Sequence, residues 1–158
     1  MPRLLGVVVG LWILDVFGRA LFPQIWTVVD PLFLLLVWLG LELPNGRFLW
    51  LWGAGLGFLK DCVTGGLFGS WTCTFGLVGW ILGRTRHIAE REDPLIQGIW
   101  AGILTAMNAL FYGLLMTLAD PTVGWNRGWW GVWLLSIIVS MGCATWSFPR
   151  FKGILKRR

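Results

Sequence analysis

The sequence predicts an all-α polytopic membrane protein with six transmembrane helices and both termini in the cytoplasm. Hydrophobic residues make up 56% of the chain, and its mean hydropathy is +0.71. Charged residues make up only 13%, which is about half the share found in soluble domains. The apolar residues are gathered in runs of roughly membrane length. With 158 residues, the chain is expected to form a single integral membrane domain, 1–158.

The lengths of the apolar runs define the candidate spans. A transmembrane helix needs about 20 mainly apolar residues to cross a hydrocarbon core about 30 Å thick. The chain offers six such runs, at about 4–22, 30–43, 47–64, 67–83, 95–119 and 129–148, and a basic cytoplasmic tail at 150–158. The second to fourth runs are short or tightly joined. A re-entrant hairpin in place of two spans between 47 and 83 is therefore the alternative.

Prolines mark several helix boundaries. Asp30-Pro31 and Asp93-Pro94 each place a capping carboxylate before a proline. In the first turn of a helix the missing N–H of proline costs nothing. Two helices are therefore expected to start there. Pro149 is expected to close the sixth span, and the charged stretch 84–93 is expected to be a cytoplasmic loop.

The basic residues predict the orientation, because short cytoplasmic segments of membrane proteins retain Lys and Arg. With the N-terminus inside, ten basic residues lie on the inner side and only Arg19, Lys60 and Arg127 on the outer side. The inner ten are Arg3, Arg47, Arg84, Arg86, Arg91, Arg150, Lys152, Lys156, Arg157 and Arg158. The net charge of +5 follows this pattern and forms no aromatic-studded basic patch, so no nucleic-acid partner is expected.

Residues that carry catalysis or bind metal are scarce. The only histidine, His87, falls in the charged loop and has no cysteine or second histidine nearby in the sequence. The three cysteines, Cys62, Cys73 and Cys143, lack metal-ligand spacing and are expected to be buried small residues, with a bridge between Cys62 and Cys73 as the alternative. The sequence therefore predicts neither an enzyme, nor a metal site, nor a cofactor.

Ionisable and amide side chains within the apolar runs need an explanation, because each charge costs about 2.5–3.5 kcal/mol on insertion scales. Asp15 and Arg19 are four residues apart on one helix face, so we expect them to pair with each other in preference to binding a partner. Asn108 lies near the centre of the fifth span. Its amide is expected to bond to another helix.

A glycine stripe is the most specific pattern in the chain. Gly53, Gly57, Asp61 and Gly65 recur every four residues and so form one narrow face of a helix. Such a face lets another backbone approach closely, and Gly55 is expected to widen the groove. The stripe predicts a helix-packing or partner-binding surface.

The residues after the stripe predict a closely packed helical hairpin. Gly65 and Gly66 are expected to break the helix and Gly69 to allow a tight return, while Gly76 and Gly79 give the next helix a small-residue face of its own. The Asp61 carboxylate has three candidate partners: the N-terminus of a neighbouring helix, a cation at Lys60 or Arg127, or a group on a partner chain.

These residues carry a resemblance to a known family. The stretches 53–61 (GAGLGFLKD), 65–69 (GGLFG) and 75–83 (FGLVGWILG) resemble the central signature of MreD, the bacterial rod-shape-determining membrane protein. The resemblance implies a fold similar to that of the S component of energy-coupling-factor transporters, located in the bacterial cytoplasmic membrane.

The resemblance also implies a function. It implies a non-catalytic scaffold of the cell-elongation machinery that binds the transmembrane helix and juxtamembrane region of MreC and helps to regulate peptidoglycan synthesis and rod shape. RodA, a class-B penicillin-binding protein, RodZ and MreB are the further partners it implies. An S-component-like subunit that binds a vitamin or another small molecule for a transporter is the alternative function.

The tail combines charge with apolar residues. Its basic residues are expected to bind anionic lipid headgroups, at about 1 kcal/mol per residue near the surface, or a cytoplasmic partner. They are Arg150, Lys152, Lys156, Arg157 and Arg158.

Overall fold

The structure is a computed structural model that describes residues 2–21, 28, 30–43, 46–64, 67–89, 93–119 and 127–156. These residues form six α-helices and one short 3₁₀ helix, and no strand occurs among them. The helices are α1 (Pro2–Leu21), α3 (Pro31–Glu42), η1 (Gly46–Phe48), α4 (Leu49–Asp61), α5 (Ser70–Ala89), α6 (Pro94–Ala119) and α7 (Arg127–Lys156). The all-helical prediction is confirmed.

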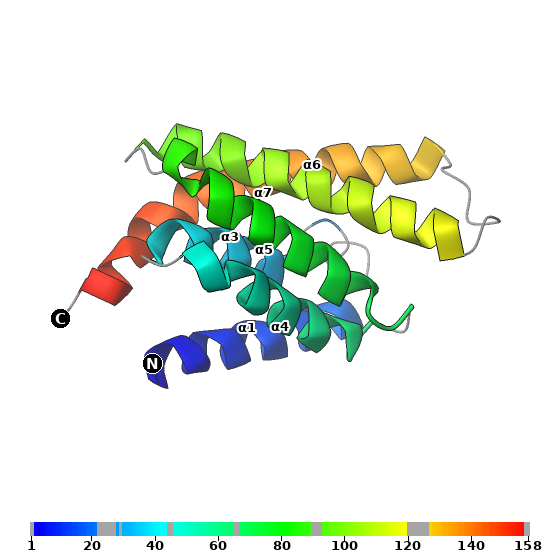
Figure 1. Ribbon diagram of the computed structural model, residues 1–158, viewed down its shortest axis with the longest axis horizontal. Helices are drawn as coiled ribbons and strands as arrows, with labels where there is room; N and C mark the ends of the chain where they lie inside the picture. Colours follow the sequence, from blue (N-terminus) through cyan, green and yellow to red (C-terminus); the bar gives the residue numbers. More distant parts are fainter. Residues whose placement is uncertain are drawn as a thin grey trace.

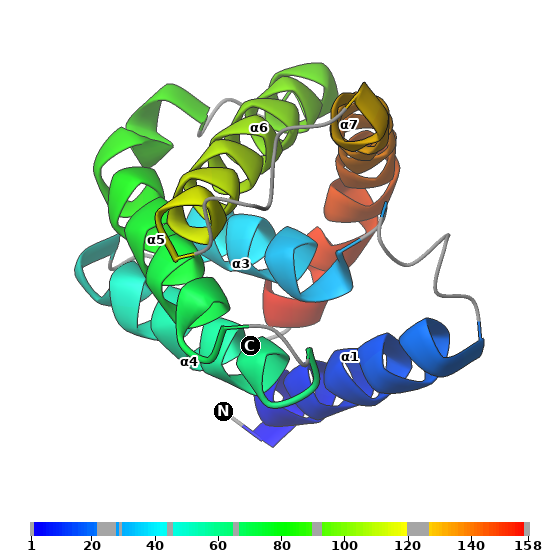
Figure 2. The same ribbon diagram turned by 90° about the vertical axis from the view of Figure 1, so that its right-hand side faces the viewer.

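Helix α3 lies at the centre of the bundle, with the other helices arranged around it (Figure 2). Eight of its 12 residues are buried, and Leu32, Leu36, Val37 and Leu39 are fully enclosed. A helix that is apolar on every side can be stable only if it is surrounded by other apolar groups. The core of the protein is therefore built around α3.

Two helix pairs form the largest interfaces, α4 with α5 and α6 with α7. Helix α6 runs along the long axis (Figure 1), whereas α1 and α3 are inclined to it (Figure 2). The start of α1 and the end of α7 lie at the same end of the bundle (Figure 1). We call this the terminal end. The end of α6 and the start of α7 project furthest at the opposite end, and the end of α1, the start of α3, the end of α4 and the start of α5 lie toward it (Figure 1).

Both predicted capping boundaries are confirmed. Asp30 Oδ1 accepts a hydrogen bond of 3.2 Å from the N–H of Phe33, and α3 begins at Pro31. Asp93 Oδ1 accepts one of 2.9 Å from the N–H of Leu95, and α6 begins at Pro94. In each helix the carboxylate satisfies an N–H group that has no partner within the helix.

Two predicted helix ends are wrong. Pro149 does not close the last helix, because α7 continues through it to Lys156. Pro149 is exposed, so its ring has room outside the bundle and the helix loses only one backbone hydrogen bond. Helix α5 continues through Arg84 to Ala89, over much of the predicted loop. Charged residues are compatible with helix, so they mark the end of the apolar run and not the end of the helix.

Two helical stretches in the described part of the chain, Pro94–Ala119 and Trp130–Pro149, are long and apolar enough to cross a membrane. Helices α3 and α4 have 12 and 13 residues. At about 1.5 Å per residue they rise about 18 and 20 Å, short of a core about 30 Å thick. Of the six α-helices in the described part of the chain, two are both long enough and apolar enough for a full crossing.

Candidate functional site

The glycine stripe of α4 packs against the backbone of α5. A Cβ atom at Gly57 would lie 2.6 Å from the carbonyl carbon of Trp71, and one at Gly53 would lie 2.8 Å from that of Phe75. On α5, a Cβ at Gly79 would lie 3.1 Å from the carbonyl carbon of Leu49. These separations are far below ordinary contact distance. The predicted close-packed hairpin is present, and its groove is filled by the same chain.

The other glycines of the motif differ in role. Gly69 has φ +94°, a left-handed conformation that favours glycine, and it precedes the first residue of α5. A Cβ at Gly76 would meet its nearest neighbour at 3.7 Å, which is ordinary contact. Gly55 is exposed and has no atom within 4 Å of such a Cβ. The prediction that Gly55 widens the groove is wrong, because two residues along a helix turn the side chain to another face. Gly65 and Gly66 lie outside the described residues.

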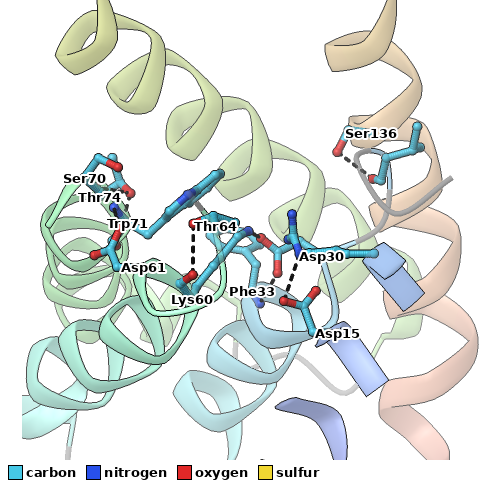
Figure 3. Close-up of polar contacts among 12 residues, drawn as sticks. Asp15, Asp30, Phe33, Lys60, Asp61, Thr64, Ser70, Trp71, Thr74 and Ser136 are labelled. Atoms are coloured by element: carbon cyan, nitrogen blue, oxygen red, sulfur yellow. Dashed lines mark hydrogen bonds and ion pairs between the residues drawn. The ribbon is translucent and has the colours of Figure 1, made fainter. Parts of the chain in front are cut away.

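Asp61 caps the N-terminus of α5. Its Oδ1 accepts a hydrogen bond of 3.1 Å from the N–H of Trp71, and its Oδ2 accepts bonds of 3.0 and 2.7 Å from the N–H and the hydroxyl of Thr72 (Figure 3). The residue is only 5% exposed. Of the partners predicted for this carboxylate, the structure therefore shows the N-terminus of the neighbouring helix. Arg127 has no described side chain.

Lys60 turns away from Asp61 and forms an ion pair with Asp30 (Figure 3). The lysine is 2% exposed, and its Nζ lies 3.6 Å from the centre of the Trp71 ring and 5.1 Å from that of Phe75. A buried ammonium needs both a counter-charge and close aromatic or polar neighbours to offset its lost hydration. Asp30 therefore serves two groups, the N–H of Phe33 and the ammonium of Lys60.

The second ion pair was predicted. Arg19 Nε donates to Asp15 Oδ2 at 3.1 Å, within one helix face of α1. The Asp15 side chain is fully buried and that of Arg19 is 23% exposed. The pairing therefore places the carboxylate inside the bundle and the guanidinium at its margin.

A polar cavity of about 330 Å³ lies between these pairs, toward the end of the bundle opposite the terminal end. Every α-helix contributes to its wall, and the lining residues with polar or aromatic groups include Arg19, Asp30, Lys60, Trp71, Asn108 and Trp133. Trp71 also stacks on Tyr112, with ring centres 4.2 Å apart and planes inclined by 19°. We call this space the polar cavity.

Asn108 does not behave as predicted. Its Oδ1 is buried and has no hydrogen-bond partner among the described residues, although a bond to another helix was expected. The residue is 7% exposed and lines the polar cavity.

An apolar groove of about 210 Å³ lies on another part of the bundle. Helices α1 and α7 both pack on α3, and α3 forms the floor between them. The groove is lined by Val7, Leu11, Leu34, Trp38, Cys143 and Trp146, among others. We call it the α1–α7 groove.

The three cysteines differ in exposure. Cys62 and Cys73 are exposed and free, and Cys143 is half-buried and free. The expectation of buried cysteines is therefore wrong for Cys62 and Cys73, which flank the turn of the hairpin and are exposed.

In the basic tail, Arg150, Lys152 and Lys156 belong to helix α7, and their side chains are not described. Arg157 and Arg158 lie outside the described residues.

Sequence reasoning missed the Lys60–Asp30 pair and the polar cavity. Asp30 lies at the start of α3 and Lys60 at the end of α4. Two consecutive antiparallel helices bring these positions to the same end of the bundle, and this was the signal that could have predicted the pair.

Among the described residues, no group of three or more His, Cys, Asp or Glu side chains could hold a metal ion. Comparisons with protein-family models, with curated proteins and with solved structures find no match for this chain.

Proposed function

We propose that the protein is a non-catalytic, multi-pass scaffold of the bacterial cytoplasmic membrane, of the MreD type. In this role it binds the transmembrane helix and juxtamembrane region of MreC, and through RodA, a class-B penicillin-binding protein, RodZ and MreB it helps to regulate peptidoglycan synthesis and rod shape. The resemblance of 53–83 to the MreD signature supports the family, and the all-helical bundle is compatible with it.

The α1–α7 groove is the observation that supports a docked helix. The glycine groove on α4 is closed by α5 and has no room for a partner. In contrast, the α1–α7 groove is open and its lining is almost wholly apolar. Association of helices in lipid depends on close packing of complementary surfaces, and an apolar depression between two helices can provide one such surface.

The surface of α1 beside this groove favours the same mode of docking. Gly6 and Gly10 are four residues apart, and a Cβ at either would meet no atom within 4 Å. They form a small-xxx-small stripe that is unoccupied by the described part of the chain. The basic tail would support the complex by binding anionic headgroups on the inner surface.

Photo-crosslinking with co-expressed MreC tests the docking site. A photoreactive residue at Val7 or Ser147, which line the α1–α7 groove, is expected to crosslink to the MreC helix. The matched control is Leu77, an exposed apolar residue of α5. Crosslinks from Leu77 with none from Val7 and Ser147 would contradict the proposed site.

Deletion of the gene in a rod-shaped host tests the function itself. Round cells that regain rod shape on expression of the wild-type chain are expected. Unchanged cell shape would overturn the scaffold proposal.

The transporter subunit that was the alternative function requires converging polar groups around a cavity. The polar cavity has such groups in Arg19, Asp30, Lys60 and Asn108.

A further inference from the structure

The polar cavity has the size and the construction of a ligand site. Pockets for small molecules have volumes of about 300–1,000 Å³ and combine apolar walls with a few polar groups. This cavity has about 330 Å³, and its wall includes the aromatic rings of Phe33, Trp71 and Trp133. The scaffold function proposed above makes no use of it.

The two cations at the cavity keep donors to spare. Arg19 has five N–H donors, of which only Nε donates to a described side chain, that of Asp15. Lys60 has three donors and gives one to Asp30. Asp30 is already committed on both oxygens. The ion pairs therefore leave N–H groups that can donate to an oxyanion.

Asn108 provides the complementary group. Its Oδ1 is buried without a partner among the described residues, although the side chain lines a polar space. An unsatisfied buried acceptor costs about 1–3 kcal/mol. A ligand that donates an N–H to this oxygen would remove that cost.

The charges of the site limit the net charge of the ligand. Arg19 and Lys60 are balanced by Asp15 and Asp30. A ligand with a net charge would add an uncompensated charge beside the buried side chains of Lys60 and Asn108, which is costly at low dielectric. A ligand that carries both signs and no net charge avoids this cost.

We propose that the polar cavity binds a zwitterion, an oxyanion joined to a primary ammonium by a short linker. The oxyanion accepts from Arg19 and Lys60, the ammonium donates to Asn108 Oδ1, and the linker contacts the ring of Trp71. A phosphatidylethanolamine headgroup and a free molecule of the same chemistry both satisfy this description. The site does not depend on the scaffold function.

Native mass spectrometry of the full chain in detergent tests the proposal with four probes. Phosphatidylethanolamine and free glycerophosphoethanolamine, both phosphodiesters, carry the complete zwitterion with no net charge. Phosphatidylcholine has the same charges but no N–H on its nitrogen, and phosphatidylglycerol has the phosphate without an ammonium. Preferred binding of phosphatidylethanolamine alone indicates a headgroup site, and saturable binding of glycerophosphoethanolamine indicates a site for free ligand.

Variants link binding to the cavity. Asn108→Leu is expected to weaken binding of the preferred probe by about tenfold or more, because one charge-assisted hydrogen bond is lost. Its thermal unfolding temperature should stay the same or rise, since the variant removes a buried unsatisfied acceptor. Thr85→Val, on α5 outside both the polar cavity and the α1–α7 groove, is the control and should bind as the wild type does.

A double variant keeps the test decisive if Asn108→Leu does not fold. Asp30→Asn with Lys60→Met removes both charges of one pair together and leaves an amide that can still cap α3. It too should lose the preferred probe. The proposal would be overturned if the wild type retained phosphatidylethanolamine and phosphatidylcholine equally. It would also be overturned if the wild type bound neither phosphatidylethanolamine nor the free zwitterion.

Discussion

Asp61 is the last residue of α4, and its carboxylate accepts three hydrogen bonds from the first turn of α5. The N–H groups of that turn have no acceptor within their own helix. A carboxylate placed there satisfies them and interacts favourably with the positive end of the helix dipole. One side chain thus joins the ends of two antiparallel helices.

Replacing Asp61 tests this cap. Asp61→Ala is expected to destabilise the folded protein by about 1–2 kcal/mol, the usual cost of losing a cap. Asp61→Asn should cost less because its amide oxygen still accepts one bond. Unfolding curves in mixed micelles provide the measurement.

Asp93→Ala is the matched control, because Asp93 caps α6 from an exposed position. It should cost less than Asp61→Ala, since water can replace an exposed cap. Equal losses from the two alanine variants would contradict a special role for the buried carboxylate.

At the scale of helices, the α4–α5 hairpin depends on glycines that differ by position. The Cβ of an alanine at Gly57 would lie 2.7 Å from the Cα of Thr72, so the two backbones would have to separate. Gly57→Ala is expected to destabilise the protein by about 1–3 kcal/mol, the range for overpacking. The thermal unfolding temperature of the purified protein measures this effect.

Gly55 provides the control on the same helix. A Cβ there meets no atom within 4 Å, so Gly55→Ala should stabilise the protein by about 0.5–1 kcal/mol through reduced chain entropy. If both variants changed stability in the same direction, close packing of α4 on α5 would not be the reason for the glycine at 57.

For the whole molecule, the orientation predicted from the basic residues can be tested with cysteine labelling. Cys62 is exposed beyond the end of α4, on the side predicted to face outward. A membrane-impermeant maleimide should label it in intact spheroplasts of a Cys73→Ser, Cys143→Ser variant. An Arg84→Cys change in a cysteine-free background should be labelled only after permeabilisation, because residue 84 is exposed near the predicted inner side. Labelling of position 84 in intact spheroplasts would contradict the orientation.

Local features of the molecule were predictable from sequence. The starts of α3 and α6, the Asp15–Arg19 pair and the hairpin all depend on residues close together in the chain, where spacing on a helix determines contact. The continuation of α5 past Arg84 was not predicted. Hydropathy indicates where the apolar residues end, but it does not indicate whether the helix continues beyond them.

The polar cavity could not be predicted in the same way. Lys60 has Asp61 beside it in the sequence and yet pairs with Asp30, which is 30 residues away. Adjacent residues on a helix point about 100° apart, so Lys60 faces α3 while Asp61 faces α5. Whether the Oδ1 of Asn108 meets a donor depends on how helices distant in the sequence pack together, for which no pattern in the chain provides a signal.

The central position of α3 has a consequence for biosynthesis. A chain made from its N-terminus completes α3 before any of α4 to α7 exists, and domains assemble as their parts emerge. Because α3 contacts helices on both sides of it in the sequence, including α7, its surface is fully covered only after the last helix has been made. Nascent chains that end after α6 should therefore still expose the part of α3 that α7 covers, and pulse-labelled truncations at Ala119 should be degraded faster than the complete chain.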